Sequence, residues 1–337
     1  MRRRQVVSPS VDPAAFCQQS NVVVVAGKGG VGKTTVTAAL ARLAADLALD
    51  VLVVELDEAG GLHNLFGHDT AFDYDETVLY EPEGGGRVRA RVITPDDALV
   101  EYLEDHGLRR VAKRLVAAGV LEVVATAIPG IREILVLGKV KQLERSGSYD
   151  LIVLDAPAAG HAVTFLTSAL GLLDAARGGP LRTQAQDVVE MLRDPARCQV
   201  MLVSLPEETP VNELIETAYR FEDLVGVALA PVVVNACYPT LTHLRADPVA
   251  AARAAGSEPP GPSEAAQLVA AARFRMSRQE LQAAQTARLA EGLPLPQLLL
   301  PYQFTAELGP SELAVLSAAV GSAIELLSVD DETGTRS

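Results

Sequence analysis

The sequence predicts an α/β fold with a doubly wound, mostly parallel sheet and an inserted helical subdomain. Short apolar, β-branched segments alternate with longer Ala- and Leu-rich segments of helical period, which is the pattern of strands joined by crossover helices. The strand segments are apolar throughout, as expected where helices cover both faces of a sheet. The chain has 337 residues, of which 49% are hydrophobic and 21% charged, and this composition allows one large core.

The expected elements alternate along the chain. Strands are expected at 22–26, 51–56, 88–93, 151–155, 200–205, 231–235 and 297–300, and helices at 33–47, 96–104, 210–223, 264–289 and 311–327. Two further stretches, about 107–145 and 168–197, have helical character without an intervening strand. We expect these stretches to be helical insertions in a single P-loop domain over 21–327, with a mobile surface loop at 253–263.

Both ends of the chain, 1–20 and 328–337, lack periodicity and are expected to be flexible. Cys17, Cys198 and Cys237 are too scattered for a disulfide framework or a CxxC metal clip. The N-terminus lacks the apolar stretch of a secretory signal, and no apolar run approaches the about 18 residues that a membrane span needs. A cytoplasmic location is therefore expected.

The charge balance bears on possible partners. The chain carries 29 basic and 43 acidic side chains, which give a formal charge of −14, and it has no Trp. Such a surface repels phosphate backbones and offers few aromatic platforms on which bases could stack. No nucleic acid partner is expected.

A glycine-rich loop follows the first expected strand and opens the first long helix. It satisfies the pattern GxxxxGK[ST] and reads Gly27-Lys28-Gly29-Gly30-Val31-Gly32-Lys33-Thr34-Thr35. The backbone N–H groups of such a loop surround phosphates, Lys33 can reach the β- and γ-phosphate oxygens, and Thr34 can offer its hydroxyl to Mg²⁺. The loop predicts a nucleotide site with Mg²⁺ as cofactor.

Polar side chains follow three other expected strands, at the edge where open α/β sheets place their ligands. Asp57 can orient the attacking water, with Glu55 as a weaker candidate for that role. Asp155 closes the apolar strand YDLIVLD and can hold Mg²⁺ through water. Asn235 ends the strand PVVVN, where its amide can read the adenine edge, and the NKxD pattern of guanine readers is absent there. ATP is therefore the expected nucleotide.

Several segments resemble the ArsA-type ATPases of the SIMIBI class of P-loop NTPases. The loop GKGGVGKTT resembles their deviant Walker A motif, and DAPAAGH at 155–161 resembles their switch II signature DTAPTGH. PGIRE at 129–133, LPEETPV at 205–211 and the late Asn235 resemble further landmarks of the family, in the same order. The resemblance covers most of 21–327. The chain has a single P-loop, whereas the arsenite-pump members of the family are usually tandem duplications.

The resemblance implies an ATP-gated dimer, either a homodimer or a heterodimer with a paralogue. In the resembling families the lysine that matches Lys28 crosses the dimer interface to the partner's nucleotide, where it acts like an arginine finger. By the same resemblance, Asp57 lies in switch I and His161 couples switch II to the nucleotide state. The loop near Pro301 is implied to pack on the adenine through its backbone.

The predicted function is a Mg²⁺-dependent ATPase whose switch regions drive the helical subdomain, and which targets or chaperones hydrophobic or membrane-associated clients. The apolar segments 115–128 and 134–140 fit either an ordinary helical core or a client groove. Ala156 and Ala159 replace family threonines in switch II, and Glu58 replaces a switch I proline. These departures leave open a slow-turnover, ATP-binding regulatory or positioning protein.

An arsenite efflux subunit is a further alternative. Three-coordinate As(III) requires soft thiolate ligands, and the cysteines of this chain do not fall on the positions that bind the metalloid in pump members. The sequence also lacks the CxxC zinc clip of the eukaryotic targeting members. Metalloid binding and a zinc-clamped dimer are therefore not expected.

Overall fold

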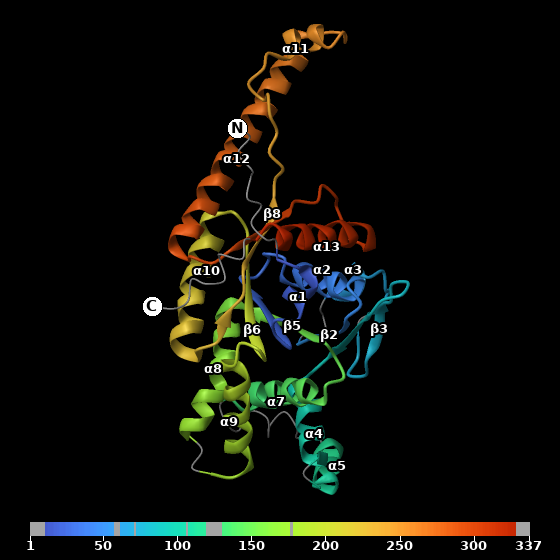
Figure 1. Cartoon of the computed structure of the whole chain (residues 1–337), viewed down its shortest axis with the longest axis vertical. Helices are drawn as coiled ribbons and strands as arrows, with labels where there is room; N and C mark the ends of the chain where they lie inside the picture. Colours follow the sequence, from blue (N-terminus) through green and yellow to red (C-terminus); the bar gives the residue numbers. More distant parts are fainter. Residues whose placement is uncertain are drawn as a thin grey trace, which may run out of the picture.

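The structure is a computed structural model that describes residues 11–56, 61–70, 72–105, 107–118, 130–175 and 178–327. In these residues a nine-stranded sheet forms the centre of the molecule and helices cover both of its faces (Figure 1). The predicted α/β class with a doubly wound, mostly parallel sheet is confirmed. Asp57, Glu58, most of the predicted apolar segment 115–128 and the predicted flexible end 328–337 lie outside the described residues.

The strand order places the glycine-rich loop at the centre of the sheet. The strands are β1 (Val22–Gly27), β2 (Asp50–Glu55), β3 (Thr77–Tyr80), β4 (Arg87–Val92), β5 (Leu151–Ala158), β6 (Cys198–Ser204), β7 (Ala228–Leu229), β8 (Val232–Cys237) and β9 (Gln297–Pro301). Their order is β3-β4-β2-β5-β1-β6-β8-β9, with β7 beside β6. Because β1 pairs in parallel with both β5 and β6, the ends of these three strands meet at one edge.

Two strands and one strand end were not expected from the sequence. β3 pairs antiparallel with β4 at the edge of the sheet, and β7 has only two residues. Neither segment has the long apolar run that marks a buried strand, since β3 is short and its Val78 is 47% exposed. β5 continues to Ala158, beyond its expected end at 155, and leads directly into the next helix.

The residues of β1 divide between two cores, one under each layer of helices. Val22 and Val24 belong to one core, and Val23 and Val25 belong to the other. The first core is covered by α7 (Ile131–Ser146), α8 (Ala159–Ala175), α9 (Pro180–Arg193) and α10 (Glu208–Arg220). The second is covered by α1 (Pro13–Cys17), α2 (Lys33–Asp46), α3 (Leu62–Leu65) and α13 (Pro310–Glu325).

The stretch predicted as helical at 107–145 contains α5 (Arg109–Ala118) and most of α7, and α4 (Pro95–Asp105) precedes it. The apolar segment 134–140 lies in α7, where Ile134 and Val140 are fully buried in the core. This burial favours the ordinary helical core for the segment, and a client groove there stays a prediction. In α5, by contrast, Val116 is 52% exposed.

Residues 11–20 correct the prediction of a flexible N-terminus over 1–20. Asp12 caps α1 by accepting a hydrogen bond from the Ala14 N–H at 3.2 Å. Phe16 and Cys17 are buried in the core beside α13. Burying these two side chains stabilises the segment by about 2 kcal/mol or more, which is enough to order a short helix against the domain.

The C-terminal half of the chain contains a projecting helical hairpin. A π-helical turn (Phe221–Val225) extends α10, and β8 is followed by a segment at 238–247, by α11 (Pro248–Ala254) and by α12 (Pro262–Gly292). α12 projects from the body with α11 at its outer end (Figure 1). The helix expected at 264–289 is confirmed, whereas the loop expected at 253–263 shrinks to a short connection between two helices. No helix in the described ranges is both long and apolar enough to cross a membrane.

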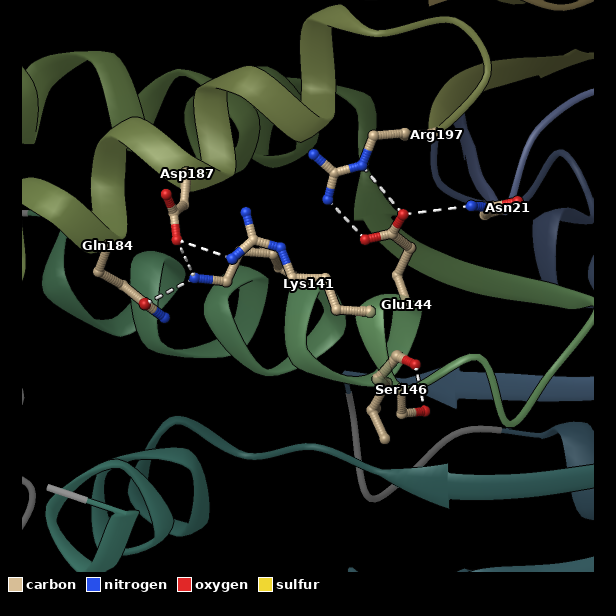
Figure 2. Close-up of polar contacts among 9 residues, drawn as sticks. Asn21, Lys141, Glu144, Ser146, Gln184, Asp187 and Arg197 are labelled. Atoms are coloured by element: carbon tan, nitrogen blue, oxygen red, sulfur yellow. Dashed lines mark hydrogen bonds and ion pairs between the residues drawn. The ribbon is translucent and has the colours of Figure 1, made fainter. Parts of the chain in front are cut away.

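A polar network ties α7 to α9 and to the amino ends of β1 and β6 (Figure 2). The Lys141 ammonium donates a hydrogen bond to Asp187 at 2.9 Å. Arg197, directly before β6, donates two hydrogen bonds to Glu144 at 2.9 and 2.6 Å, and Asn21, directly before β1, donates a third to Glu144 at 3.2 Å. These bonds fasten the helical layer to the end of the sheet opposite the glycine-rich loop.

Candidate nucleotide-binding site

The glycine-rich loop joins β1 to α2 in a conformation that needs glycine. Gly30 and Gly32 have φ values of 84° and 89°, in the left-handed region that favours glycine. A Cβ on Gly27 would lie 2.3 Å from the Val203 carbonyl oxygen of β6. Since Gly32 is also the N-cap of α2, the positive end of this helix dipole meets the loop. The loop therefore has the backbone of an anion site.

Thr34 and Asp155 meet on one side of this loop. The Thr34 hydroxyl donates a hydrogen bond to Oδ2 of Asp155 at 2.6 Å, since β5 lies next to β1. Oδ1 of Asp155 is buried and has no hydrogen-bond partner within the described ranges. Burial raises the pKa of the Asp155 carboxyl, against the opposing effects of Thr34, Lys33 and Thr37. A hydroxyl beside a carboxylate oxygen without a partner is a donor set that suits Mg²⁺, so the residues present fit this ion.

A cavity of about 300 Å³ opens beside this pair, and Lys33, Glu55 and Asp155 are among its lining residues. Burial lowers the pKa of the Lys33 ammonium, although Asp155 acts in the opposite direction. Nζ of Lys33 lies 3.5 Å from the Lys28 carbonyl oxygen. Glu55 is buried and accepts a hydrogen bond from the Leu62 N–H at 3.4 Å. A phosphate in this cavity would give Lys33 the counter-charge that its surroundings supply only weakly.

A second cavity, of about 350 Å³, lies on the other side of the loop. Thr35, Asn235 and Pro301 line it together with residues of the loop itself. The structure thus brings the predicted adenine residues to the predicted phosphate loop. The Asn235 side chain also has a role that the sequence did not indicate, because its Nδ2 donates to the Val31 carbonyl oxygen at 2.9 Å. Reading of the adenine edge by Asn235 stays a prediction.

Lys28 pairs within its own chain. Its Nζ lies 2.5 Å from Oε1 of Glu213 on α10, and the two side chains are 38% and 44% exposed. Glu213 was not predicted, because nothing in the sequence links two residues so far apart in the chain. The predicted helix at 210–223 was the one available signal, since it follows the strand next to the loop.

His161, the predicted switch II residue, lies outside the linings of the two cavities. It is exposed in the first turn of α8. Tyr238 and Tyr302 were not predicted. Their rings stack with centroids 4.8 Å apart, and Tyr302 lines the second cavity. Each tyrosine directly follows a strand, at the sheet edge that carries the site. Their position was therefore available from the sequence, although their contact was not.

All three described cysteines are buried and lie in separate elements. Burial, with Asp12 nearby, raises the pKa of the Cys17 thiol to about 12, and burial, with Glu144 nearby, raises that of Cys198 to about 12. Burial alone raises the pKa of the Cys237 thiol to about 11. These surroundings disfavour the thiolate form that binds soft metals and metalloids.

This chain is similar in sequence to known ATPases. Residues 20–172 match the family of anion-transporting ATPases. The ATPase BagA of Mycobacterium tuberculosis is 33% identical over 255 residues, which are 74% of this chain and 73% of that protein. The ATPase get3 of Schizosaccharomyces pombe is 30% identical over 175 residues, which are 50% of this chain and 51% of that protein.

A more distant relative has a name that refers to an arsenical pump. A protein of Halobacterium salinarum, provisionally named an arsenical pump-driving ATPase, is 27% identical over 247 residues, 66% of this chain and 36% of that protein. The matched family region contains the loop, Thr34 and Asp155, which the structure brings together. Hydrolysis of ATP is the activity that these names share. The chain therefore belongs to the ArsA-type family of anion-transporting ATPases.

Proposed function

We propose that this protein is a Mg²⁺-dependent ATPase that acts as an ATP-gated dimer. The observation that carries the proposal is the bond between Thr34 and Asp155 beside the glycine-rich loop. Within the described ranges, Lys33 has no carboxylate in ion-pair contact and Asp155 keeps one oxygen without a partner. A nucleotide with Mg²⁺ supplies partners of the right charge for both groups.

In this proposal different residues bind the phosphates, the metal ion and the adenine. The N–H groups of the loop and the Lys33 ammonium bind the phosphates, and the Thr34 hydroxyl and Asp155 hold the metal, Asp155 through water. Bound Mg²⁺ neutralises charge on the phosphate oxygens. Asn235 and the backbone near Pro301 bind the adenine from the second cavity.

Asp57 is the residue we assign to orient the attacking water. In the sequence it directly follows Leu56, and Leu56 lines the cavity of Lys33 and Asp155. Glu55 lines the same cavity but is buried and already accepts a backbone hydrogen bond. Glu55 is therefore better suited to fix the start of switch I than to orient the water.

Lys28 is assigned a role in trans, at the nucleotide of the partner chain. Its contact with Glu213 is between two partly exposed side chains, and such pairs contribute about 0–1 kcal/mol. A triphosphate carries more charge than one carboxylate, so exchange of Glu213 for the partner's nucleotide is favourable once the chains close. Closing would then complete the site and couple hydrolysis to dimerisation.

The biological role we propose is the targeting or chaperoning of hydrophobic or membrane-associated clients. The resemblance to ArsA-type ATPases, which include targeting members, implies this role, and the buried thiols of this chain give no support to an arsenite site. The client surface is assigned to the helical subdomain, of which α5 presents Val116 at 52% exposure. The family description as anion-transporting favours arsenite efflux as the second candidate.

The test is to measure phosphate release and oligomeric state together, with ATP and Mg²⁺ or with EDTA. Lys28→Ala and Asp57→Asn are compared with the unmodified chain, and arsenite is added in a parallel series. We expect a dimer that hydrolyses ATP, loss of turnover in EDTA and in both variants, and no response to arsenite. If Asp57→Asn lost turnover and Lys28→Ala kept it, Lys28 would have no role in the mechanism.

Two other outcomes would replace the proposal. Tight ATP binding and dimerisation without phosphate release would support the slow-turnover regulatory protein. Stimulation of turnover by arsenite would support the efflux subunit.

A further inference from the structure

α5 lies at an extremity of the molecule, at the lower end of the view in Figure 1. Among the described elements its principal neighbour is α4, and of its ten residues only Ala112 is fully buried. Most of the helix surface is therefore open to a partner outside the chain.

The charge of α5 differs from that of the chain as a whole. Its sequence, RRVAKRLVAA, has four basic side chains and no acidic one, although the whole chain has a formal charge of −14. All four basic side chains, Arg109, Arg110, Lys113 and Arg114, are exposed. Within the described ranges, only Arg109 is in ion-pair contact. α5 is therefore a locally basic surface that attracts anions, whereas most of the protein repels them.

The acidic side chains of α4 do not neutralise this surface. Glu101 accepts hydrogen bonds from Tyr74 and from Lys139, so its charge is already paired within the body of the protein. Glu104 lies 3.8 Å from Arg109, and the two side chains are 36% and 70% exposed. A contact between groups this exposed contributes little and is easily exchanged for another anion.

The basic side chains share the outward face of α5. Arg110 and Arg114 are about one turn apart, and Ala112, two residues from each, points to the opposite side of the helix. Because Ala112 is buried, the arginines face away from the protein. Val111 and Val116, which are 43% and 52% exposed, flank the basic face at its two edges, at about 100° per residue.

A basic face with apolar side chains at its edges suits the surface of an anionic lipid bilayer. Guanidinium and ammonium groups bind lipid phosphates, and short apolar side chains beside them enter the boundary between headgroups and acyl chains. An apolar client helix offers no counter-charge for four basic groups. A nucleic acid does, but α5 has no aromatic side chain on which a base could stack.

We propose that the basic face of α5 docks this protein on the surface of an anionic lipid bilayer. For its biological role the proposal rests on the proposed function, since docking brings the helical subdomain to the membrane where a membrane-associated client lies. The contact is peripheral and weakens as the ionic strength rises. No residue of α5 is among those that line the two nucleotide cavities, so docking needs no hydrolysis.

The test is flotation of the full chain, without nucleotide, with vesicles of phosphatidylcholine alone or with about 30% phosphatidylglycerol added. We expect binding to the anionic vesicles, little binding to the neutral ones, and release as NaCl is raised. Arg110→Glu/Arg114→Glu should weaken binding about 10-fold or more, because each reversed charge lies near the lipid surface. The matched control is Arg253→Glu/Arg273→Glu, which makes the same change of charge at exposed positions of α11 and α12 and should bind like the unmodified chain.

Urea denaturation shows that both double variants are folded, since all four exchanged side chains are exposed. Equal binding to neutral and anionic vesicles, or an equal loss in both double variants, would overturn the proposal. Binding to polyglutamate but to neither kind of vesicle would also overturn it, in favour of an acidic protein partner. Asp57→Asn should lose turnover and still bind the anionic vesicles, so failure of the ATPase mechanism and failure of docking give different results.

Discussion

Two groups of charged side chains lie at opposite ends of the parallel strands, and they are paired very differently. At the amino ends, Arg197 and Glu144 share two hydrogen bonds, and Lys141 and Arg145 share Asp187 (Figure 2). At the carboxyl ends, Lys33 reaches only a carbonyl oxygen at 3.5 Å within the described ranges. The first group is complete within the chain, and the second is not.

The pKa shifts show the same difference. The hydrogen bonds from Arg197 and Lys141 hold the pKa values of Glu144 and Asp187 below their usual range. Burial instead raises the pKa of Asp155 and lowers that of Lys33, so both groups are less stable in their charged forms. A charged cluster whose side chains find their ion-pair and hydrogen-bond partners within the chain stabilises the fold. A cluster whose side chains lack such partners is suited to bind a charged ligand.

Exchange of a single lysine in each group gives the largest expected difference. Lys33→Met should lower kcat/KM for ATP by about 10²–10³-fold, because it removes a charge that acts on the transferring phosphoryl group. Its unfolding free energy without nucleotide should not fall, since Lys33 has no ion-pair partner to lose within the described ranges. Phosphate release and urea denaturation measure the two effects.

Lys141→Met is the matched control for this exchange. It should keep the ATPase activity and lose about 1–3 kcal/mol of unfolding free energy, because Asp187 and Gln184 lose a nearly buried donor. If both variants lost the same property, the two clusters would not differ as argued.

Glu144→Gln tests whether the hydrogen bonds accepted by the Glu144 carboxylate stabilise the fold. Glu144 accepts three hydrogen bonds and its side chain is 6% exposed, so the exchange should cost about 2 kcal/mol of unfolding free energy at pH 7. Because the folded pKa of Glu144 is lowered, its contribution is present above the ordinary glutamate pKa of about 4.3 and is lost as the pH falls through the folded value. The unmodified chain and the variant should therefore converge in acid; a constant difference down to pH 2 would contradict this explanation.

Asp155→Asn should have the opposite pH dependence and a smaller effect. The folded pKa of Asp155 is raised, so its ionised form destabilises the nucleotide-free protein at pH 7, and this cost disappears as the pH falls toward the ordinary aspartate value. The variant should gain up to about 1 kcal/mol of unfolding free energy at pH 7 and lose that advantage near pH 4. Denaturation without nucleotide at several pH values measures this difference.

The sequence predicted the parts of the site that local patterns determine. The loop from Gly27 to Thr35, the strand that ends near Asp155 and the parallel sheet all depend on short runs whose period and composition are visible in the chain. The contacts of Lys28 with Glu213 and of Asn235 with Val31 join residues that are distant in sequence, so only the fold could reveal them. The ordered segment 11–20 was missed for a similar reason, because its stability comes from burial beside α13.

Glu213→Gln gives the smallest expected effect. It tests whether the contact with Glu213 holds Lys28 back from its role in turnover. Removing the carboxylate frees Lys28, and a contact worth about 0–1 kcal/mol can change turnover by at most about 5-fold. We expect turnover to rise within that limit, whereas Glu216→Gln, at an exposed position of the same helix, should leave it unchanged. The Lys28→Ala/Glu213→Gln double variant should show no rise, because the group that is released is absent. A rise that persisted in the double variant would mean that Glu213 acts on the site through something other than Lys28.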